Sequence, residues 1–153
     1  MLWGFELSGQ IPTKIERESM ELPARVDFTS LAAELLLKLT QANGPLMFHQ
    51  SGGCCDGSAP MCYLDGEFRV GGADVLLAEL EVPEISKPIN FWMSAAQFEY
   101  WKHTHLTIDV VPGRGGGFSL ESPEGVRFII RSRLFTDAEW ALLENEVVPT
   151  GRS

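Results

Sequence analysis

Leucines recur at helical spacing in the first third of the chain. They are Leu31, Leu35, Leu36 and Leu39, which fall on one side of a helix with about 3.6 residues per turn. Asp27 or Thr29 can cap the start of this helix, and an Asn-Gly-Pro sequence after Ala42 ends it. The pattern predicts a well-buried helix reaching about Ala42.

Strand-like patterns follow, separated by turn residues. They predict strands over 46–51, 74–82, 89–93, 106–110, 118–121 and 126–135. In the second of these, the inner face is expected to hold Leu76, Ala78, Leu80 and Val82. Two capping boxes, Ser94 with Gln97 and Thr136 with Glu139, predict helices to about 103 and 147.

The predicted order α-β-β-β-α-β-β-β-α is typical of an α+β domain, with a mixed or antiparallel sheet packed with about three helices. Residues 1–23 do not share this pattern and are interpreted as an N-terminal extension. Residues 24–148 form the predicted single domain, and residues 149–153 form a C-terminal tail.

Composition and charge narrow the classes of partner. The 153 residues are 44% apolar and 22% charged, as in an ordinary globular domain. Twelve Lys and Arg against twenty-one Asp and Glu give a net charge of −9, which argues against nucleic acid and anionic membranes as partners. No apolar run approaches the ~20 residues of a membrane helix, and the first residues lack a basic start. A cytoplasmic protein is therefore expected.

The segment from His49 to Cys62, HQSGGCCDGSAPMC, carries most of the candidate chemistry. Its three cysteines are odd in number, which argues against a disulfide framework, and three thiols within nine residues indicate metal or redox chemistry. With His49 or Asp56, they offer sulfur, nitrogen and oxygen ligands for iron, zinc or copper(I). The predicted metal-ligand set is Cys54, Cys55, Cys62, His49 and Asp56.

The same segment is open to two other interpretations. Glycines 52, 53 and 57 expose backbone amides that favour a thiolate, so Cys54 or Cys55 could be a nucleophile. Alternatively, the cysteines are buried small hydrophobic residues and the glycines only form turns.

Histidines and arginines provide further candidates. His105 shares a strand face with Thr107 and Asp109. Both His105 and His103 are interpreted in two ways, as a metal ligand or proton carrier, or as a surface residue. Arg114, Gly115 and Gly116 lie in a glycine-rich turn that could bind an anion. Arg131 and Arg133 share a strand face and could bind an anion or a partner, although cross-strand ion pairing is the slightly preferred explanation.

The stretch from about 24 to 147 resembles an uncharacterised bacterial domain family, often encoded beside NAD-dependent aldehyde dehydrogenases. The motifs that carry this resemblance are HQSGGCCDGSAPMC, FWMSAAQFEYWKHTHLTIDVVPGRGGGFSLE and GVRFIIRSRLF. The resemblance implies a link to aldehyde metabolism and an aldehyde dehydrogenase as partner.

A more distant resemblance is to the HesB-like A-type iron–sulfur carriers. It is carried by Gly52-Gly53-Cys54, by a Ser-x-x-x-x-Tyr-Trp-x-x-Thr segment leading into Ile-Asp-Val-Val, and by a Gly-x-Gly-Phe turn at 115–118. In those carriers the matching cysteine joins a C-terminal Cys-Gly-Cys to hold iron or a cluster, usually across a dimer. Only Cys54 carries over, because the chain has no C-terminal cysteine; Cys55 and Cys62 would replace the missing ligands.

Together these patterns predict a cytoplasmic, homodimeric, metal- or iron–sulfur-binding accessory protein of aldehyde metabolism with a HesB-like architecture. A thiol-dependent enzyme with Cys54 or Cys55 as nucleophile is the first alternative. A non-catalytic module that binds a dehydrogenase is the second. Whether the protein is an enzyme stays open, with the accessory role preferred.

Overall fold

The computed structural model describes residues 22–50, 58–113 and 119–151. The chain divides into two compact units, one of residues 24–135 with 147–153 and one of residues 1–23 with 136–146. The larger unit carries both sheets and most of the predicted site residues. In the smaller unit, α4 (Asp137–Leu143) begins with the predicted capping box between Thr136 and Glu139.

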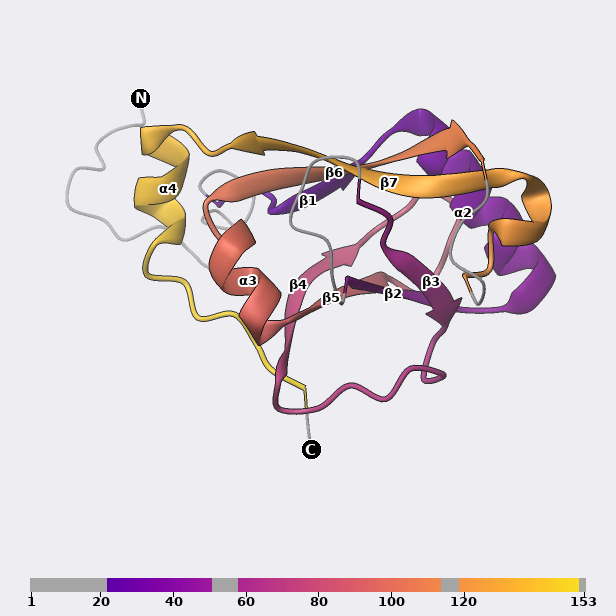
Figure 1. The fold of residues 1–153 in the computed structure, drawn as a ribbon, viewed down its shortest axis with the longest axis horizontal. Coiled ribbons are helices and arrows are strands. Elements are labelled where there is room, and N and C mark those ends of the chain that lie inside the picture. The colour runs from indigo at the N-terminus through magenta and orange to yellow at the C-terminus, as the bar shows by residue number, and fades with distance from the viewer. Residues whose placement is uncertain (1–21, 51–57, 114–118, 152–153) are drawn as a thin grey trace, which may run out of the picture. The chain divides into compact units, whose positions relative to one another are not determined.

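The larger unit is built on two mixed sheets (Figure 1). In the three-stranded sheet, β6 (Thr104–Pro112) lies between β1 (Val26–Phe28), which is parallel to it, and β7 (Val126–Leu134), which is antiparallel. The four-stranded sheet has the order β3-β2-β5-β4, with β3 (Met61–Leu64), β2 (Leu46–Gln50), β5 (Ile89–Ser94) and β4 (Asp74–Leu80). The two central strands β2 and β5 are parallel, and the outer strands are antiparallel to them.

The helices of this unit begin at capping residues that the sequence indicates. Helix α2 (Ser30–Asn43) starts after Thr29, whose side-chain oxygen accepts a hydrogen bond from the Ala32 amide. Helix α3 (Ala95–Trp101) starts after Ser94 in the same way, and a short 3₁₀ helix, η1, spans Ser122–Glu124. None of the described helices is long and apolar enough to cross a membrane.

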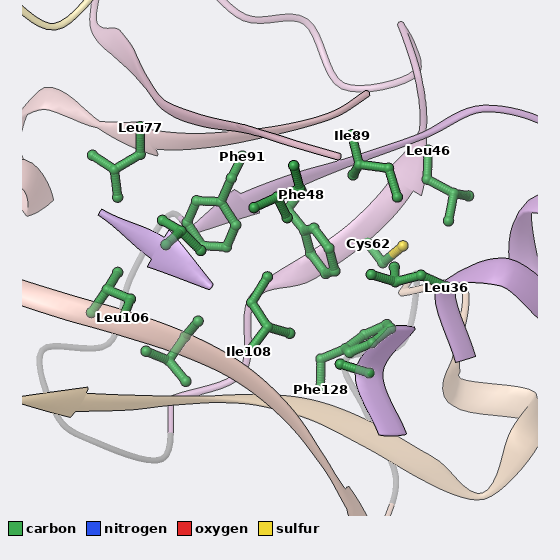
Figure 2. Close-up of a cluster of buried hydrophobic side chains, with 14 of the residues drawn as sticks. Leu36, Leu46, Phe48, Cys62, Leu77, Ile89, Phe91, Leu106, Ile108 and Phe128 are labelled. Carbon is green, nitrogen blue, oxygen red and sulfur yellow. The ribbon is translucent and has the colours of Figure 1, made fainter. Parts of the chain in front are cut away.

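The core fills the space between the two sheets (Figure 2). Phe48 of β2 contacts Phe91 of β5 and Phe128 of β7, with ring centroids 5.6 and 5.1 Å apart. The Phe48–Phe128 pair meets edge to face at 84°, a favoured aromatic geometry worth about 0.5–1.5 kcal/mol beyond burial. Helix α2 adds Leu36 and Leu39 to the same cluster.

The α+β class, the mixed sheets and the three helices of the described residues confirm the main expectations from sequence. The sequence does not predict two short strands, β1 and β3. Strand β1 depends on pairing with β6, which is distant in the sequence, and β3 depends on pairing with β2, whose sequence pattern differs. The strand predicted over 118–121 is wrong in its described part, since residues 119–121 form a turn that leads into η1.

Two burial predictions are also corrected. The register of β4 against β5 shifts between Leu76 and Ala78, and this bulge moves Val75 and Leu77 into the core in place of Leu76. The well-buried face predicted for α2 does not extend to Leu31, which is 60% exposed, whereas Leu36 and Leu39 are buried.

Candidate functional site

His49 and Cys62 lie on adjacent strands but on opposite faces of the four-stranded sheet. In the β2–β3 pairing, His49 is opposite Met61, and Phe48 is opposite Cys62. Successive side chains of a strand alternate between faces. Cys62 therefore shares the core face with Phe48, as Figure 2 shows, and His49 lies on the outer face.

On the outer face, His49 forms a buried pair with Asp74 at the start of β4. The distance between His49 Nε2 and Asp74 Oδ1 is 2.8 Å, and the two side chains are 3% and 14% exposed. The other carboxylate oxygen of Asp74, Oδ2, accepts a hydrogen bond of 3.0 Å from the Gly71 amide. The pair thus joins the central strand β2 to the edge strand β4, across the intervening strand β5.

The carboxyl group of Asp74 favours its charged form. Burial alone would raise its pKa, but the hydrogen bonds from His49 and from the Gly71 amide, together with the charge interaction with His49, outweigh burial and lower the pKa. An ionised carboxylate only accepts hydrogen bonds, so Nε2 of His49 carries the shared proton.

An aromatic side chain from the loop between β3 and β4 covers His49. The ring of Phe68 stacks on the imidazole at 4.1 Å between centroids and 26° between planes. Phe68 also lies 5.3 Å from the ring of Tyr63 on β3. The loop therefore excludes much of the water that would weaken the interaction between His49 and Asp74.

The C-terminal segment fixes the backbone around Asp74. Gly151 donates an amide hydrogen bond of 3.1 Å to the Asp74 carbonyl, and Leu76 donates one of 2.8 Å to the Pro149 carbonyl. A Cβ atom on Gly151 would lie 2.7 Å from the Gly71 carbonyl oxygen, so the close approach of these segments requires glycine here. Residues 149–151 thus pair with the edge of β4 beside the Asp74 carboxylate.

On the opposite face, Cys62 belongs to a buried polar cluster with Ser119 and Glu121. The Cys62 amide donates to the Ser119 hydroxyl at 2.9 Å, and the Leu120 amide donates to the Cys62 carbonyl at 3.0 Å. Glu121 is fully buried; its carboxylate accepts from the Ser119 hydroxyl and, at 3.1 Å, from the Phe128 amide. The cluster ties residues 119–121 to β3 and β7.

This environment keeps the Cys62 thiol protonated. Burial raises its pKa, and the charge of Glu121 raises it further. The thiolate is the form that binds metals and attacks electrophiles, so Cys62 has the character of a structural cysteine. The expected convergence of Cys62 and His49 on one metal ion is corrected, because the two side chains face away from each other across the sheet.

Within the described ranges, no group of three or more His, Cys, Asp or Glu side chains could hold a metal ion. Cys54, Cys55 and Asp56 lie outside those ranges, as do Arg114, Gly115 and Gly116. The predictions for these six residues stay predictions.

Arg131 and Arg133 lie on the outer face of the three-stranded sheet. Arg131 Nε donates to Asp109 Oδ2 at 2.7 Å, as the interpretation by ion pairing predicts. This contact is the first cause of the lowered pKa of the Asp109 carboxyl. On the same sheet, His105 Nε2 lies 3.0 Å from Asp27 Oδ2, whereas His103 is exposed.

The sequence did not single out Asp74, Phe68, Ser119 or Glu121. Asp74 was expected only as the first residue of a strand, and its partner is 25 residues away. A glutamate two residues after a serine gives no signal of burial by itself. These residues are recognised only when the strands are paired.

The chain belongs to a family of domains of unknown function, DUF779, whose model matches residues 35–134. This range covers α2 from residue 35 onward and both sheets except β1, and it contains His49, Cys62, Asp74 and Glu121. No curated protein and no solved structure matches the chain. The HesB-like architecture and the association with aldehyde dehydrogenases therefore stay predictions.

Proposed function

We propose that the protein is thiol-dependent, with His49 as the base for a cysteine of the loop 51–57, Cys54 or Cys55. The observation that carries this proposal is the buried His49–Asp74 pair at the start of that loop. Cys54 follows His49 by five residues, so chain connectivity keeps their Cα atoms within about 18 Å. The two cysteines enter the proposal through the sequence alone.

The division of roles follows the logic of Cys-His-Asp sites. Asp74 is ionised and holds the His49 ring through Nε2, and Nδ1 accepts the thiol proton. The carboxylate then stabilises the resulting imidazolium. Phe68 supports this arrangement because it covers His49, and a charge pair that is partly shielded from water interacts more strongly than one in water.

The resemblance to proteins encoded beside aldehyde dehydrogenases supplies the substrate class, an aldehyde. The thiolate sulfur forms a bond to the carbonyl carbon, and the electron pair of the carbonyl double bond moves to oxygen. That oxygen takes the proton from the His49 imidazolium and gives a hemithioacetal. The addition needs no oxidant or metal, and an aldehyde dehydrogenase would be the partner that supplies or receives the captured aldehyde.

The test uses ¹³C-labelled acetaldehyde and the purified full chain. We expect a new carbon resonance from the sulfur adduct, saturating with aldehyde, lost in Cys54→Ser or Cys55→Ser and retained in Cys62→Ser. Its rate of formation should fall in His49→Gln. No adduct at any aldehyde concentration, or an adduct that only Cys62→Ser abolishes, would contradict the proposal.

A second candidate keeps the same loop but binds a metal ion without Cys62. An imidazole oriented by a carboxylate is the usual arrangement of a metal-bound histidine, and Cys54 and Cys55 would add two thiolates. Anaerobic purification followed by elemental analysis distinguishes the two. Stoichiometric metal that is lost in Cys54→Ser and in His49→Ala, with no aldehyde adduct, would favour this candidate.

A further inference from the structure

A second candidate site lies on the other sheet, on the outer face of β6 and β7. A pocket of about 220 Å³ is lined there by His105, Thr107, Arg131, Ser132 and Arg133. His105 is opposite Arg133 in the strand pairing, and Thr107 is opposite Arg131, so the four side chains form two neighbouring cross-strand pairs on one face. None of the lining residues is acidic, although the whole chain carries a net charge of −9.

Arg131 and His105 are held in place from outside the pocket. Asp109 accepts from Arg131 Nε at 2.7 Å, and Asp109 itself accepts from the Thr29 hydroxyl at 2.9 Å and the Val110 amide at 2.8 Å. Asp27 holds His105 through Nε2 at 3.0 Å. Side chains that are already ordered bind a ligand at lower entropic cost than flexible ones.

Anchoring through Nε leaves the end of Arg131 available. Its two Nη groups make no hydrogen bond to any residue in the described part of the chain, and the same holds for the Thr107 hydroxyl. An arginine whose terminal donors are open can bind an oxyanion through two parallel hydrogen bonds. Thr107, directly opposite, supplies a hydroxyl donor.

We propose that this pocket binds a carboxylate group, held by the Nη donors of Arg131 with Thr107, His105 and Arg133 around it. Arg131 and Arg133 offset the charges of Asp27 and Asp109. The two nearby carboxylates therefore repel a doubly charged phosphate more strongly than a monoanion. The volume is below the ~300–1,000 Å³ of drug-sized sites, which fits a small carboxylate or the carboxylate end of a larger molecule.

Acetate and inorganic phosphate are the probes, added to the ¹⁵N-labelled full chain at constant ionic strength. We expect saturable NMR shifts with acetate at the amides of Thr107 and Arg131 and at the Arg131 side chain, with weaker effects from phosphate. Arg131→Gln should weaken acetate binding by about tenfold or more, because it removes the charge-assisted pair. Arg131→Lys, which keeps the positive charge but loses the paired Nη donors of the guanidinium group, should also weaken acetate binding.

Arg69→Gln is the matched control, because it removes one exposed arginine from a loop outside the pocket. It should bind acetate like the unmodified protein, and all variants should keep the remaining resonances in place. Shifts that stay linear with acetate, or that are equal in Arg131→Gln and the unmodified protein, would overturn the site. Saturable binding of phosphate without acetate would overturn its assignment to a carboxylate.

Discussion

The two faces of the β2–β3 pair differ in what their polar groups can do. On the outer face, His49 and Asp74 form a titratable pair in which the carboxyl pKa is lowered. On the core face, Cys62, Ser119 and Glu121 form a closed network in which the thiol pKa is raised. His49 and Cys62, the two ends of one cysteine-rich segment, thus belong to a buried His–Asp pair and to a buried polar cluster, because the pairing of β2 with β3 places their side chains on opposite faces.

The first consequence concerns the reactivity of Cys62, where the largest effect is expected. Its thiol is fully buried and protonated, so alkylation requires that the protein opens. We expect iodoacetamide to modify Cys62 in the folded protein at least ~10³-fold more slowly than in denaturant. Peptide-resolved mass spectrometry measures this rate. Rapid modification of Cys62 in the folded chain would remove the distinction between the faces.

Glu121→Leu tests the structural side of the comparison. The variant leaves the Ser119 hydroxyl and the Phe128 amide buried without their acceptor, so we expect a loss of about 3–5 kcal/mol in the free energy of unfolding. Urea denaturation measures it. The matched variant Glu121→Gln, which retains one acceptor oxygen, should lose less, about 1–3 kcal/mol. Equal stability of all three proteins would show that the cluster is not structural.

Asp74→Asn tests the His49–Asp74 pair on the outer face through the dependence of stability on pH. A carboxyl group whose folded pKa is lowered stabilises the fold above its unfolded pKa of about 3.9, and this contribution is lost as the pH falls through the folded value. At pH 7 we expect Asp74→Asn to cost about 1–2 kcal/mol. The difference from the unmodified protein should shrink at acidic pH, which chemical denaturation across pH would detect. A constant difference would contradict an ionised Asp74.

Phe68→Leu should produce the smallest change. It removes the stacked ring from His49 while keeping an apolar side chain, and we expect a loss of about 0.5–1.5 kcal/mol in stability. The His49 ring should become more accessible to diethylpyrocarbonate. Tyr100→Leu is a suitable control, because it removes an aromatic ring that is 74% exposed. An unchanged rate of His49 modification would mean that Phe68 does not shield the pair.

Local signals in the sequence were sufficient for much of the fold. Thr29, Ser94 and Thr136 cap helices as expected, since capping depends on residues only three apart. The strands β6 and β7 were also expected, because their apolar residues alternate over long runs. The bulge in β4 was not expected, because one extra residue reverses the alternation of buried and exposed side chains without any local sequence signal.

The site was predicted only in part, for a related reason. His49 was recognised as a candidate from its residue type and its place before the cysteines. Its partner Asp74 and its cover Phe68 come from a segment that meets β2 only when the sheet has formed. Proximity along the chain suggested that Cys62 joins the same site, but the pairing of β3 with β2 turns its side chain to the core.

The most direct test of the division between faces is the pH–rate profile of alkylation of each cysteine. At pH 7 an ordinary thiol, with a pKa of about 8.5, is only ~3% thiolate, so an adjacent base can increase its reactivity by about tenfold or more. We predict that His49→Gln and Asp74→Asn remove this increase at Cys54 or Cys55, whereas Cys62→Ala leaves it unchanged. Alkylation of Cys54 and Cys55 at the same rate with and without His49 would contradict the account.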